Sequence, residues 1–276
     1  SCTVRLNELM SGHTSFKIGG PADILVLPES IEQLREVLKV VKETVVPLTL
    51  LGNGSNVLVR DKGIRGIVIK LGNMLRHFYE AEDLLVFGSG YSLALASYKA
   101  MECGKTGMEF AVGIPGSIGG AVYMNAGAYD GEMQNIVNCV KVMDLQGNER
   151  VLTAEELNFG YRKTSLQNSG LIVTEVTLKM PSGNKDEIKS KMDDFSHRRI
   201  SKQPLEMPSA GSMFKRPPGY FAGTLIDQAG LKGYTVGGAQ ISTKHAGFVV
   251  NVGGATAADV LQLIKDVQTK IKAGVG

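Results

Sequence analysis

The chain has 276 residues, enough for about two domains, and its 43% hydrophobic and 21% charged residues are typical of a soluble globular protein. Its net charge of +3 is too small to favour nucleic acid on electrostatic grounds. No apolar run approaches the roughly 20 residues that a membrane helix requires. We therefore expect neither nucleic acid nor a membrane as a partner, whereas a slight positive excess suits an anionic small-molecule substrate.

The three cysteines, Cys2, Cys103 and Cys139, are widely spaced and odd in number. They form neither a metal-type pair nor a disulfide framework, which favours a reducing compartment. The chain starts without the apolar core of a signal peptide, so we expect a cytoplasmic protein. The four histidines lack zinc-ligand spacing, and no metal site is predicted.

The first part of the chain alternates strand and helix patterns. Residues 24–27 predict a short strand, and Ser30 to Gln33 form a capping box that opens an amphipathic helix. Residues 48–51 predict a buried strand that runs directly into the loop Gly52-Asn53-Gly54-Ser55-Asn56. A glycine loop at the carboxyl end of a strand is where α/β folds place ligands. Residues 57–59 predict another short strand.

The middle of the chain is richer in strand patterns. A helix is predicted from Leu93 to Cys103, ended by Gly104. A hairpin turn is predicted at 146–148, and a second capping box, from Thr153 to Glu156, predicts a short helix. The predicted strands span residues 66–70, 84–88, 137–145 and 171–180.

The last part opens with a polar amphipathic helix over about residues 185–200, capped by Asn184. Breaks around this helix place a domain boundary near 181–205. A short helix at 224–229 and strands at 236–241 and 247–252 follow. A final helix from Thr256 would bury Val260, Leu261, Ile264, Val267 and Ile271.

Residues 113–129 form a glycine-rich run with almost no charge. Glycine permits positive φ and lets backbone N–H groups approach a ligand, and a concave row of N–H groups binds phosphate. The run therefore indicates a wall around a large phosphorylated cofactor. A buried turn cluster in a glycine-rich fold is the alternative interpretation.

Three further segments could carry chemistry, each with a structural alternative. Arg162 suits bidentate binding of carboxylate or phosphate, although the pattern taken alone favours a solvated cationic turn. Ser212, between Gly211 and a Pro-rich stretch, lacks a nucleophile elbow, so a proton-donor role is favoured over a nucleophilic one, with an ordinary turn serine as the alternative. Residues 240–247 place cationic groups between two strands, as in a substrate site or a basic hairpin tip.

Taken together, these segments resemble the UDP-N-acetylenolpyruvoylglucosamine reductase (MurB) family, flavoenzymes of peptidoglycan precursor synthesis. Residues 163–170 are short, which resembles the subtype without a tyrosine-bearing substrate loop. The motifs in chain order are Thr14-Ser15-Phe16-Lys17-Ile18-Gly19-Gly20, Gly52–Asn56, the run at 113–129, Tyr161-Arg162, Gly211–Lys215 and Leu231-Lys232-Gly233.

The resemblance implies an α+β fold: a two-lobed FAD-binding domain of the vanillyl-alcohol-oxidase (PCMH) type, with lobes at 1–70 and 71–185, and a smaller α+β substrate-binding domain at 186–276. Lys202, Lys215, Lys244 and His245 are the implied substrate-binding residues. The implied cofactor-binding residues are Gly52, Asn53, Gly54, Ser55, Asn56, Gly113, Ile114, Pro115, Gly116, Ser117, Gly119, Gly120, Asn125, Ala126, Gly127, Val173 and Arg199.

The implied reaction uses NADPH and FAD to reduce UDP-N-acetylglucosamine enolpyruvate to UDP-N-acetylmuramate in the cytoplasm, by a monomeric enzyme. Arg162 would stabilise an enolate, and Ser212 would protonate it. The family's third catalytic group, a glutamate in a strand after the final helix, has no counterpart before Gly276, so we expect the natural chain to continue. Another FAD-dependent oxidoreductase of the superfamily, or a non-catalytic FAD- or nucleotide-sugar-binding protein, are the alternative functions.

Overall fold

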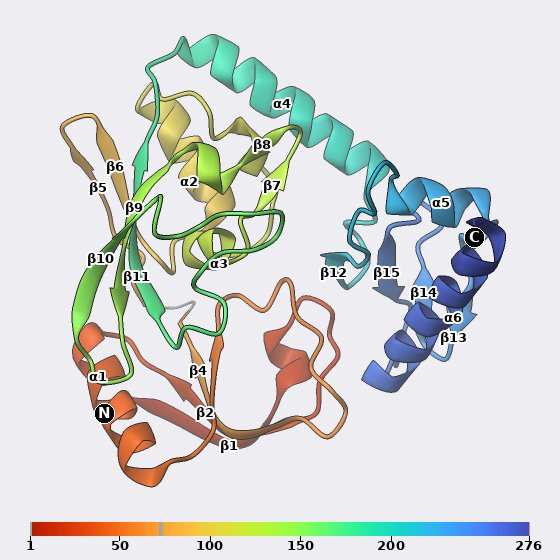
Figure 1. The fold of residues 1–276 in the computed structure, drawn as a ribbon, viewed down its shortest axis with the longest axis horizontal. Helices are drawn as coiled ribbons and strands as arrows, with labels where there is room; N and C mark the ends of the chain where they lie inside the picture. Colours follow the sequence, from red (N-terminus) through yellow and green to blue (C-terminus); the bar gives the residue numbers. More distant parts are fainter. Residues whose placement is uncertain (1, 72–73, 276) are drawn as a thin grey trace. The chain divides into compact units, whose positions relative to one another are not determined.

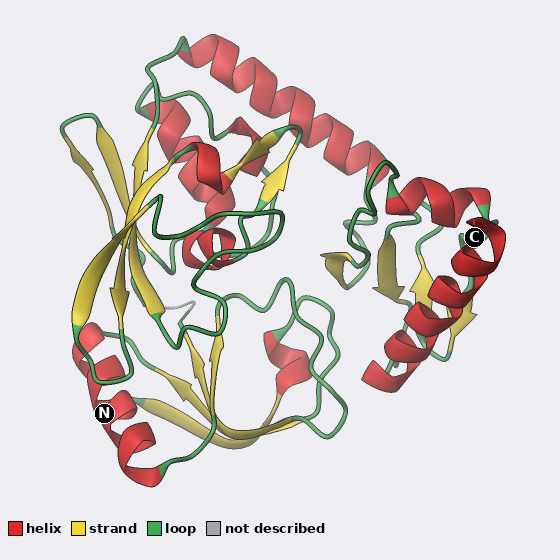
Figure 2. Cartoon of the chain, in the orientation of Figure 1, coloured by secondary structure: helices red, strands yellow, loops and turns green. Residues whose placement is uncertain are grey.

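The computed structural model describes residues 2–71 and 74–275, which divide into two compact units (Figures 1 and 2). Both units are built from non-contiguous stretches of the chain. The first unit contains Ser1–Arg5, Ile24–Asn53 and Gly66–His197, and the second contains Leu6–Asp23, Gly54–Arg65 and Arg198–Gly276.

The N-terminal sheet has the strand order β1-β2-β4-β3, and β3 runs parallel to β4. Its helix α1 (Ile31–Thr44) begins where the sequence predicts, because the Ser30 side chain accepts a hydrogen bond from the Gln33 amide. The buried stripe of α1 packs with strand residues such as Ile67 and Ile69. The strands are β1 (Thr3–Leu9), β2 (Pro21–Leu27), β3 (Leu48–Leu51) and β4 (Ile64–Lys70), with a 3₁₀ turn at Met10–His13.

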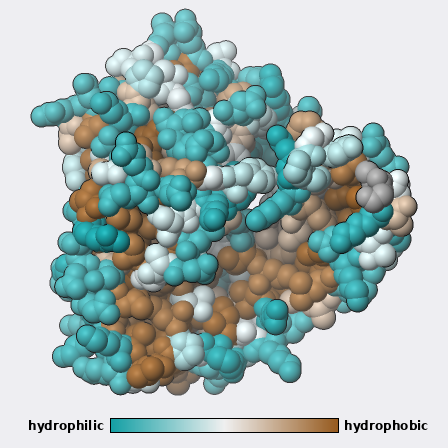
Figure 3. Space-filling view, in the orientation of Figure 1, coloured by the Kyte–Doolittle hydropathy of each residue, from teal (hydrophilic) through white to brown (hydrophobic). Residues whose placement is uncertain are grey.

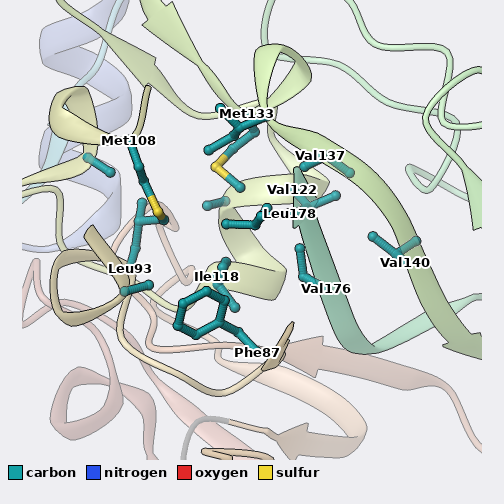
Figure 4. Close-up of a cluster of buried hydrophobic side chains, with 14 of the residues drawn as sticks. Phe87, Leu93, Met108, Ile118, Val122, Met133, Val137, Val140, Val176 and Leu178 are labelled. Carbon is teal, nitrogen blue, oxygen red and sulfur yellow. The ribbon is translucent and has the colours of Figure 1, made fainter. Parts of the chain in front are cut away.

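The second sheet has the order β10-β9-β11-β6-β5 and is antiparallel throughout. Two helices, α2 (Leu93–Glu102) and α3 (Ile118–Tyr123), contribute apolar side chains to its core. Figure 4 shows this core, in which Phe87 and Ile118 lie among the strand side chains. The strands are β5 (Phe78–Ala81), β6 (Leu84–Gly88), β9 (Val137–Met143), β10 (Glu149–Thr153) and β11 (Ile172–Lys179).

Short elements connect α3 to this sheet. The hairpin β7 (Gly127–Ala128) and β8 (Gly131–Glu132) follows α3, and 3₁₀ turns lie at Glu109–Ala111 and Met133–Asn135. A Cβ at Gly131 would lie 2.6 Å from the Phe110 ring, so glycine is required where the hairpin crosses this side chain. The glycine run of the sequence is thus a loop, a short helix and a tight hairpin.

The long helix α4 (Lys185–Lys202) starts at the predicted cap, where Asn184 Oδ1 accepts hydrogen bonds from the amides of Asp186 and Glu187. Its predicted stripe, Ile188, Met192 and Phe195, is buried. Figure 3 shows hydrophilic side chains along the outer surface of α4, as its sequence requires.

The third sheet, β12-β15-β14-β13, belongs to the second unit and packs with α6 (Ala257–Val275). Asp61 holds the start of α6 by accepting hydrogen bonds from the Ala257 and Ala258 amides. The remaining elements are β12 (Ser209–Ser212), α5 (Ala222–Gln228), β13 (Thr235–Val236), β14 (Ala239–Ile241) and β15 (Phe248–Asn251).

Two strand predictions are wrong. Residues 57–59 have no strand geometry, because Val59 is buried by side-chain packing without joining a ladder. The predicted strand 236–241 is two strands separated by Gly237 and Gly238, and a Cβ at Gly237 would lie 2.4 Å from the Asp259 carboxyl group.

Two helix predictions also need correction. The capping box at Thr153 and Glu156 forms both of its reciprocal hydrogen bonds, but the chain continues as a turn instead of a helix. In α6, Leu261 is 46% exposed, and Leu263 takes the buried position on that face. The structure also contains β1 and β5, which the sequence patterns do not predict.

None of the helices that the structure describes has the length and hydropathy of a membrane span. Within the same residues, no group of three or more His, Cys, Asp or Glu side chains could hold a metal ion. The three cysteines are unpaired thiols. Burial and the Glu80 carboxylate raise the pKa of Cys103 to about 11, which keeps this thiol protonated at neutral pH.

Candidate functional site

The glycine loop after β3 approaches the start of α3. A Cβ at Gly52 would lie 3.0 Å from the Ser117 Oγ, so this contact needs glycine or a shift of the serine. The Ser117 side chain in turn accepts a hydrogen bond from the Gly120 amide at 3.3 Å. Two segments separated by more than 60 residues, each predicted to bind the cofactor, are thus adjacent in the first unit. The second half of the loop, Gly54–Asn56, belongs to the second unit.

The segment after β6 is hydrogen-bonded to the glycine run. The Gly119 amide donates to the Ser89 carbonyl at 2.9 Å, and the Ile118 amide donates to the Tyr91 carbonyl at 2.9 Å. The glycine pattern predicts that N–H groups of this stretch bind phosphate. The amides of Gly119 and Gly120 instead donate hydrogen bonds to the Ser89 carbonyl and the Ser117 Oγ, and these bonds hold the loop in shape.

Asn125 is a fully buried connector, with 0% of its surface exposed and a positive φ of 42°. Its Nδ2 donates to Glu132 Oε2 and to the Gly160 carbonyl, both at 3.0 Å. Its Oδ1 accepts from the Gln134 amide at 3.0 Å. A residue that satisfies three partners at once fixes the geometry of the run around it, and its side chain is fully occupied.

Arg162 lies against the same run. Its Nη1 donates to the Asn125 carbonyl at 3.0 Å, and its Nη2 donates to the Gly127 carbonyl at 2.9 Å. The guanidinium also lies 5.4 Å from the Tyr161 ring centroid. The planar fork of arginine matches two carbonyls at once, so the positive charge is held in one place before any substrate arrives. Arg162 itself has φ 56°, a left-handed conformation that is uncommon for arginine.

Val173 lies on β11, opposite Val142, and is 8% exposed. The register of β11 against β9 shifts between Val173 and Glu175, and the Thr174 hydroxyl bonds to the Lys141 carbonyl at 3.2 Å. A bulge of this kind turns side chains locally and is common beside functional sites. The irregularity lies directly beside the predicted cofactor residue.

Ser212 ends β12 in the second unit, opposite Phe248, and is exposed. A Cβ at Gly247 would lie 3.3 Å from the Ser212 Oγ and 3.0 Å from the His245 Cε1, so both side chains flank this glycine. The structure therefore brings Ser212 and His245 together, although the sequence separates them by more than 30 residues.

His245 is held in one orientation. Its Nδ1 accepts a hydrogen bond from the Gly247 amide at 3.1 Å, and its ring meets Phe248 edge-on at 5.0 Å between centroids. Burial lowers the pKa of His245, and the nearby Lys232 ammonium lowers it further. The ring is therefore neutral at pH 7 and carries its proton on Nε2.

The remaining predicted cations of the second unit have different surroundings. Lys244 is anchored, because its Nζ donates to the Ile200 carbonyl at 2.8 Å and lies 3.8 Å from Glu206. Arg199 is buried, with 8% of its surface exposed. Lys202 and Lys215 are exposed, as a site for a diphosphate would require.

Two further residues of the first unit contact the glycine run and are not predicted by the sequence patterns. Glu132 accepts the Asn125 amide, and its carboxylate also accepts a short hydrogen bond from Gln134. Ser89 lies against Gly119, since a Cβ at Gly119 would lie 2.7 Å from the Ser89 Cβ. The only available signal for Ser89 was its position between Gly88 and Gly90.

These residues fit an FAD pyrophosphate. A Cβ at Gly119 would clash with the Ser89 Cβ, and Gly52 lies tightly against the Ser117 Oγ. The buried Ser89 Oγ has no hydrogen-bond partner among the described residues. Close-packed glycines beside a polar hydroxyl are what a nucleotide phosphate requires of its binding loop.

Comparison with known families assigns two domains. Residues 22–153 match the model of an FAD-binding domain, and residues 203–276 match that of the UDP-N-acetylenolpyruvoylglucosamine reductase C-terminal domain. The chain is therefore a flavoprotein with a PCMH-type FAD-binding domain, and the predicted α+β fold is confirmed.

Individual relatives span nearly the whole chain. The chain is 49% identical to a UDP-N-acetylenolpyruvoylglucosamine reductase of Clostridioides difficile (strain 630) over 273 residues, 99% of this chain and 90% of the relative. It is 52% identical to that of Clostridium perfringens (strain SM101 / Type A) over 269 residues, 98% of this chain and 88% of the relative.

A solved structure supports the same family assignment. The crystal structure of UDP-N-acetylenolpyruvylglucosamine reductase (MurB) from Thermus caldophilus superimposes with a TM-score of 0.84 at 40% identity, covering 98% of this chain and 95% of that one. The chain belongs to the UDP-N-acetylenolpyruvoylglucosamine reductase (MurB) family.

Proposed function

We propose that this chain reduces UDP-N-acetylglucosamine enolpyruvate to UDP-N-acetylmuramate with NADPH, as a step of peptidoglycan precursor synthesis in the cytoplasm. The observation that carries the proposal is the Arg162 guanidinium, which is held by two carbonyls of the glycine run. That run lies within the residues that match an FAD-binding domain. Bound FAD would supply the redox chemistry by accepting hydride from NADPH and delivering it to C3 of the enolpyruvyl group.

Arg162 is the proposed electrostatic catalyst. Addition of hydride to C3 leaves negative charge over C2 and the substrate carboxylate. A guanidinium that is already fixed by the carbonyls of Asn125 and Gly127 stabilises this charge without reorganising during the reaction. Because two of its five N–H groups make these contacts, the fork retains donors for a carboxylate.

Ser212 is the proposed proton donor. Its O–H bond breaks as a C–H bond forms at C2, which completes the lactyl ether. A serine hydroxyl is a weak acid at neutral pH, so this step depends on the strong basicity of the enolate carbon and on a fixed donor position. The exposed end of β12 leaves the Ser212 hydroxyl accessible to substrate.

The cationic residues of the second unit are proposed to hold the substrate. Lys202, Lys215 and Lys244 would bind the diphosphate, and neutral His245 would donate a hydrogen bond. The buried Arg199 would lie near a flavin or substrate phosphate.

We also propose that the chain belongs to the subtype without the tyrosine-bearing substrate loop. Residues 163–170 form a compact turn, in which Gln167 Nε2 donates to the Arg162 carbonyl at 3.1 Å and the Thr164 hydroxyl donates to the Tyr123 carbonyl at 2.9 Å. The division into lobes at 1–70 and 71–185 with a substrate domain at 186–276, and a monomeric state, remain proposals.

The test separates the two half-reactions. Purified protein should be yellow, and Ser212→Ala should be reduced by NADPH at the wild-type rate but fail to reduce the enolpyruvyl substrate. The matched control is Ser201→Ala, which removes an exposed hydroxyl of α4 and should leave both half-reactions unchanged. Equal loss of both half-reactions in a folded Ser212→Ala protein would refute the proton-donor role. A colourless protein that FAD cannot reconstitute would refute the proposed function.

A further inference from the structure

Ser89 is fixed between two candidate cofactor segments of the first unit. Its amide donates to the carbonyl of Thr174, the neighbour of Val173, at 2.9 Å. Its carbonyl accepts the Gly119 amide at 2.9 Å. Both ends of the Ser89 peptide are therefore anchored, one to β11 and one to the first turn of α3.

The side chain of Ser89, unlike its backbone, makes no hydrogen bond to the described residues. The residue is 4% exposed, and its Oγ has no hydrogen-bond partner among the described residues. Burying a hydroxyl without a partner costs about 1–3 kcal/mol, and the large majority of buried polar groups are satisfied in native structures. Ser97, a buried serine of the adjacent α2, shows the ordinary arrangement, because its hydroxyl donates to the Ala94 carbonyl at 2.8 Å.

The surroundings identify what the hydroxyl would bind. The backbone donors of Ile118 and Gly119 are used within the chain, whereas the Ser89 O–H beside them has no acceptor among the described residues. A Cβ at Gly119 would meet the Ser89 Cβ at 2.7 Å, so glycine at 119 is what admits a side chain at 89. A hydroxyl donates to an anionic oxygen more strongly than to a neutral one.

We propose that Ser89 is a cofactor-binding residue that donates a hydrogen bond to a pyrophosphate oxygen of FAD. The proposal rests on FAD binding by the proposed enzyme and adds a residue to the predicted site. The cofactor would supply the acceptor that the hydroxyl lacks in the protein alone.

The test compares Ser89→Ala with Ser97→Ala in the full chain, after removal of FAD. FAD is titrated back by flavin fluorescence, ADP is used as a probe that carries the diphosphate without the flavin, and unfolding of both apoproteins is followed by circular dichroism. Ser89→Ala should weaken the binding of FAD and of ADP by the same factor, about tenfold to 150-fold, the range for a hydrogen bond to a charged group. Its apoprotein should be as stable as the wild type or more stable.

Ser97→Ala should show the reverse pattern, with unchanged FAD affinity and a less stable apoprotein. Wild-type FAD affinity in Ser89→Ala would overturn the proposal. So would weaker FAD binding with unchanged ADP binding, since the hydroxyl would then contact the flavin half. A destabilised Ser89→Ala apoprotein would overturn it as well, because the hydroxyl would then have a partner inside the protein. Failure of the wild type to bind FAD would refute the proposed function itself.

Discussion

Arg162→Lys keeps the positive charge but removes the fork that holds it. The wild-type guanidinium reaches the carbonyls of Asn125 and Gly127 at 3.0 and 2.9 Å, and a single lysine ammonium on a flexible stem cannot span both. The ammonium would then give the developing enolate at least one charge-assisted hydrogen bond fewer than the guanidinium, about 1.5–3 kcal/mol, which corresponds to roughly a tenfold to 150-fold slower step.

Stopped-flow absorbance of the flavin is the assay. Reduction by NADPH should keep its wild-type rate, because Arg162 is proposed to act only when charge develops on the substrate. Reoxidation by the enolpyruvyl substrate should slow by the factor above. Arg150→Lys, at an exposed position of β10, is the control and should change neither rate. Wild-type reoxidation in Arg162→Lys, or equal slowing of both steps, would refute the role of a fixed guanidinium.

Two further variants test the surrounding structure. Asn125→Ala leaves the Gln134 amide, the Gly160 carbonyl and the Glu132 carboxylate without their shared partner and should cost about 3 kcal/mol in chemical unfolding; a loss below about 1 kcal/mol would contradict the connector role. Burial lowers the folded pKa of His245 below its ordinary value of 6.5, so the unfolded chain binds a proton more readily. Its contribution to stability is therefore complete above pH 6.5 and is lost as the pH falls through the folded pKa. His245→Asn should flatten this part of the stability profile measured between pH 5 and 8, where histidine titrates, and an unchanged slope would contradict the assignment.

Local sequence patterns correctly predicted the helices in which a capping residue is followed by apolar residues at helical spacing. Ser30 and Asn184 cap the helices that follow them, and the stripe of α4 is buried as its spacing indicates. Prediction failed where a helix start signal was not followed by helical periodicity. The capping box at Thr153 forms its hydrogen bonds, yet no apolar periodicity follows to extend a helix.

The candidate site was likewise predicted only in part from the sequence. Residue types alone pointed to the glycine run and to Arg162, because few other patterns suit phosphate and carboxylate. The two carbonyls that hold Arg162, and the approach of Gly52 to Ser117, depend on long-range folding and could not be read from spacing. The unpartnered hydroxyl of Ser89 is a property of burial, which appears only in three dimensions.

The most direct test of the proposed function is the stoichiometry of turnover with UDP-N-acetylglucosamine enolpyruvate. NADPH oxidation by the purified flavoprotein should require this substrate, and each NADPH consumed should yield one molecule of UDP-N-acetylmuramate by mass spectrometry. NADPH oxidation that proceeds without the substrate, or FAD-loaded protein that forms no lactyl ether product, would contradict the proposed function.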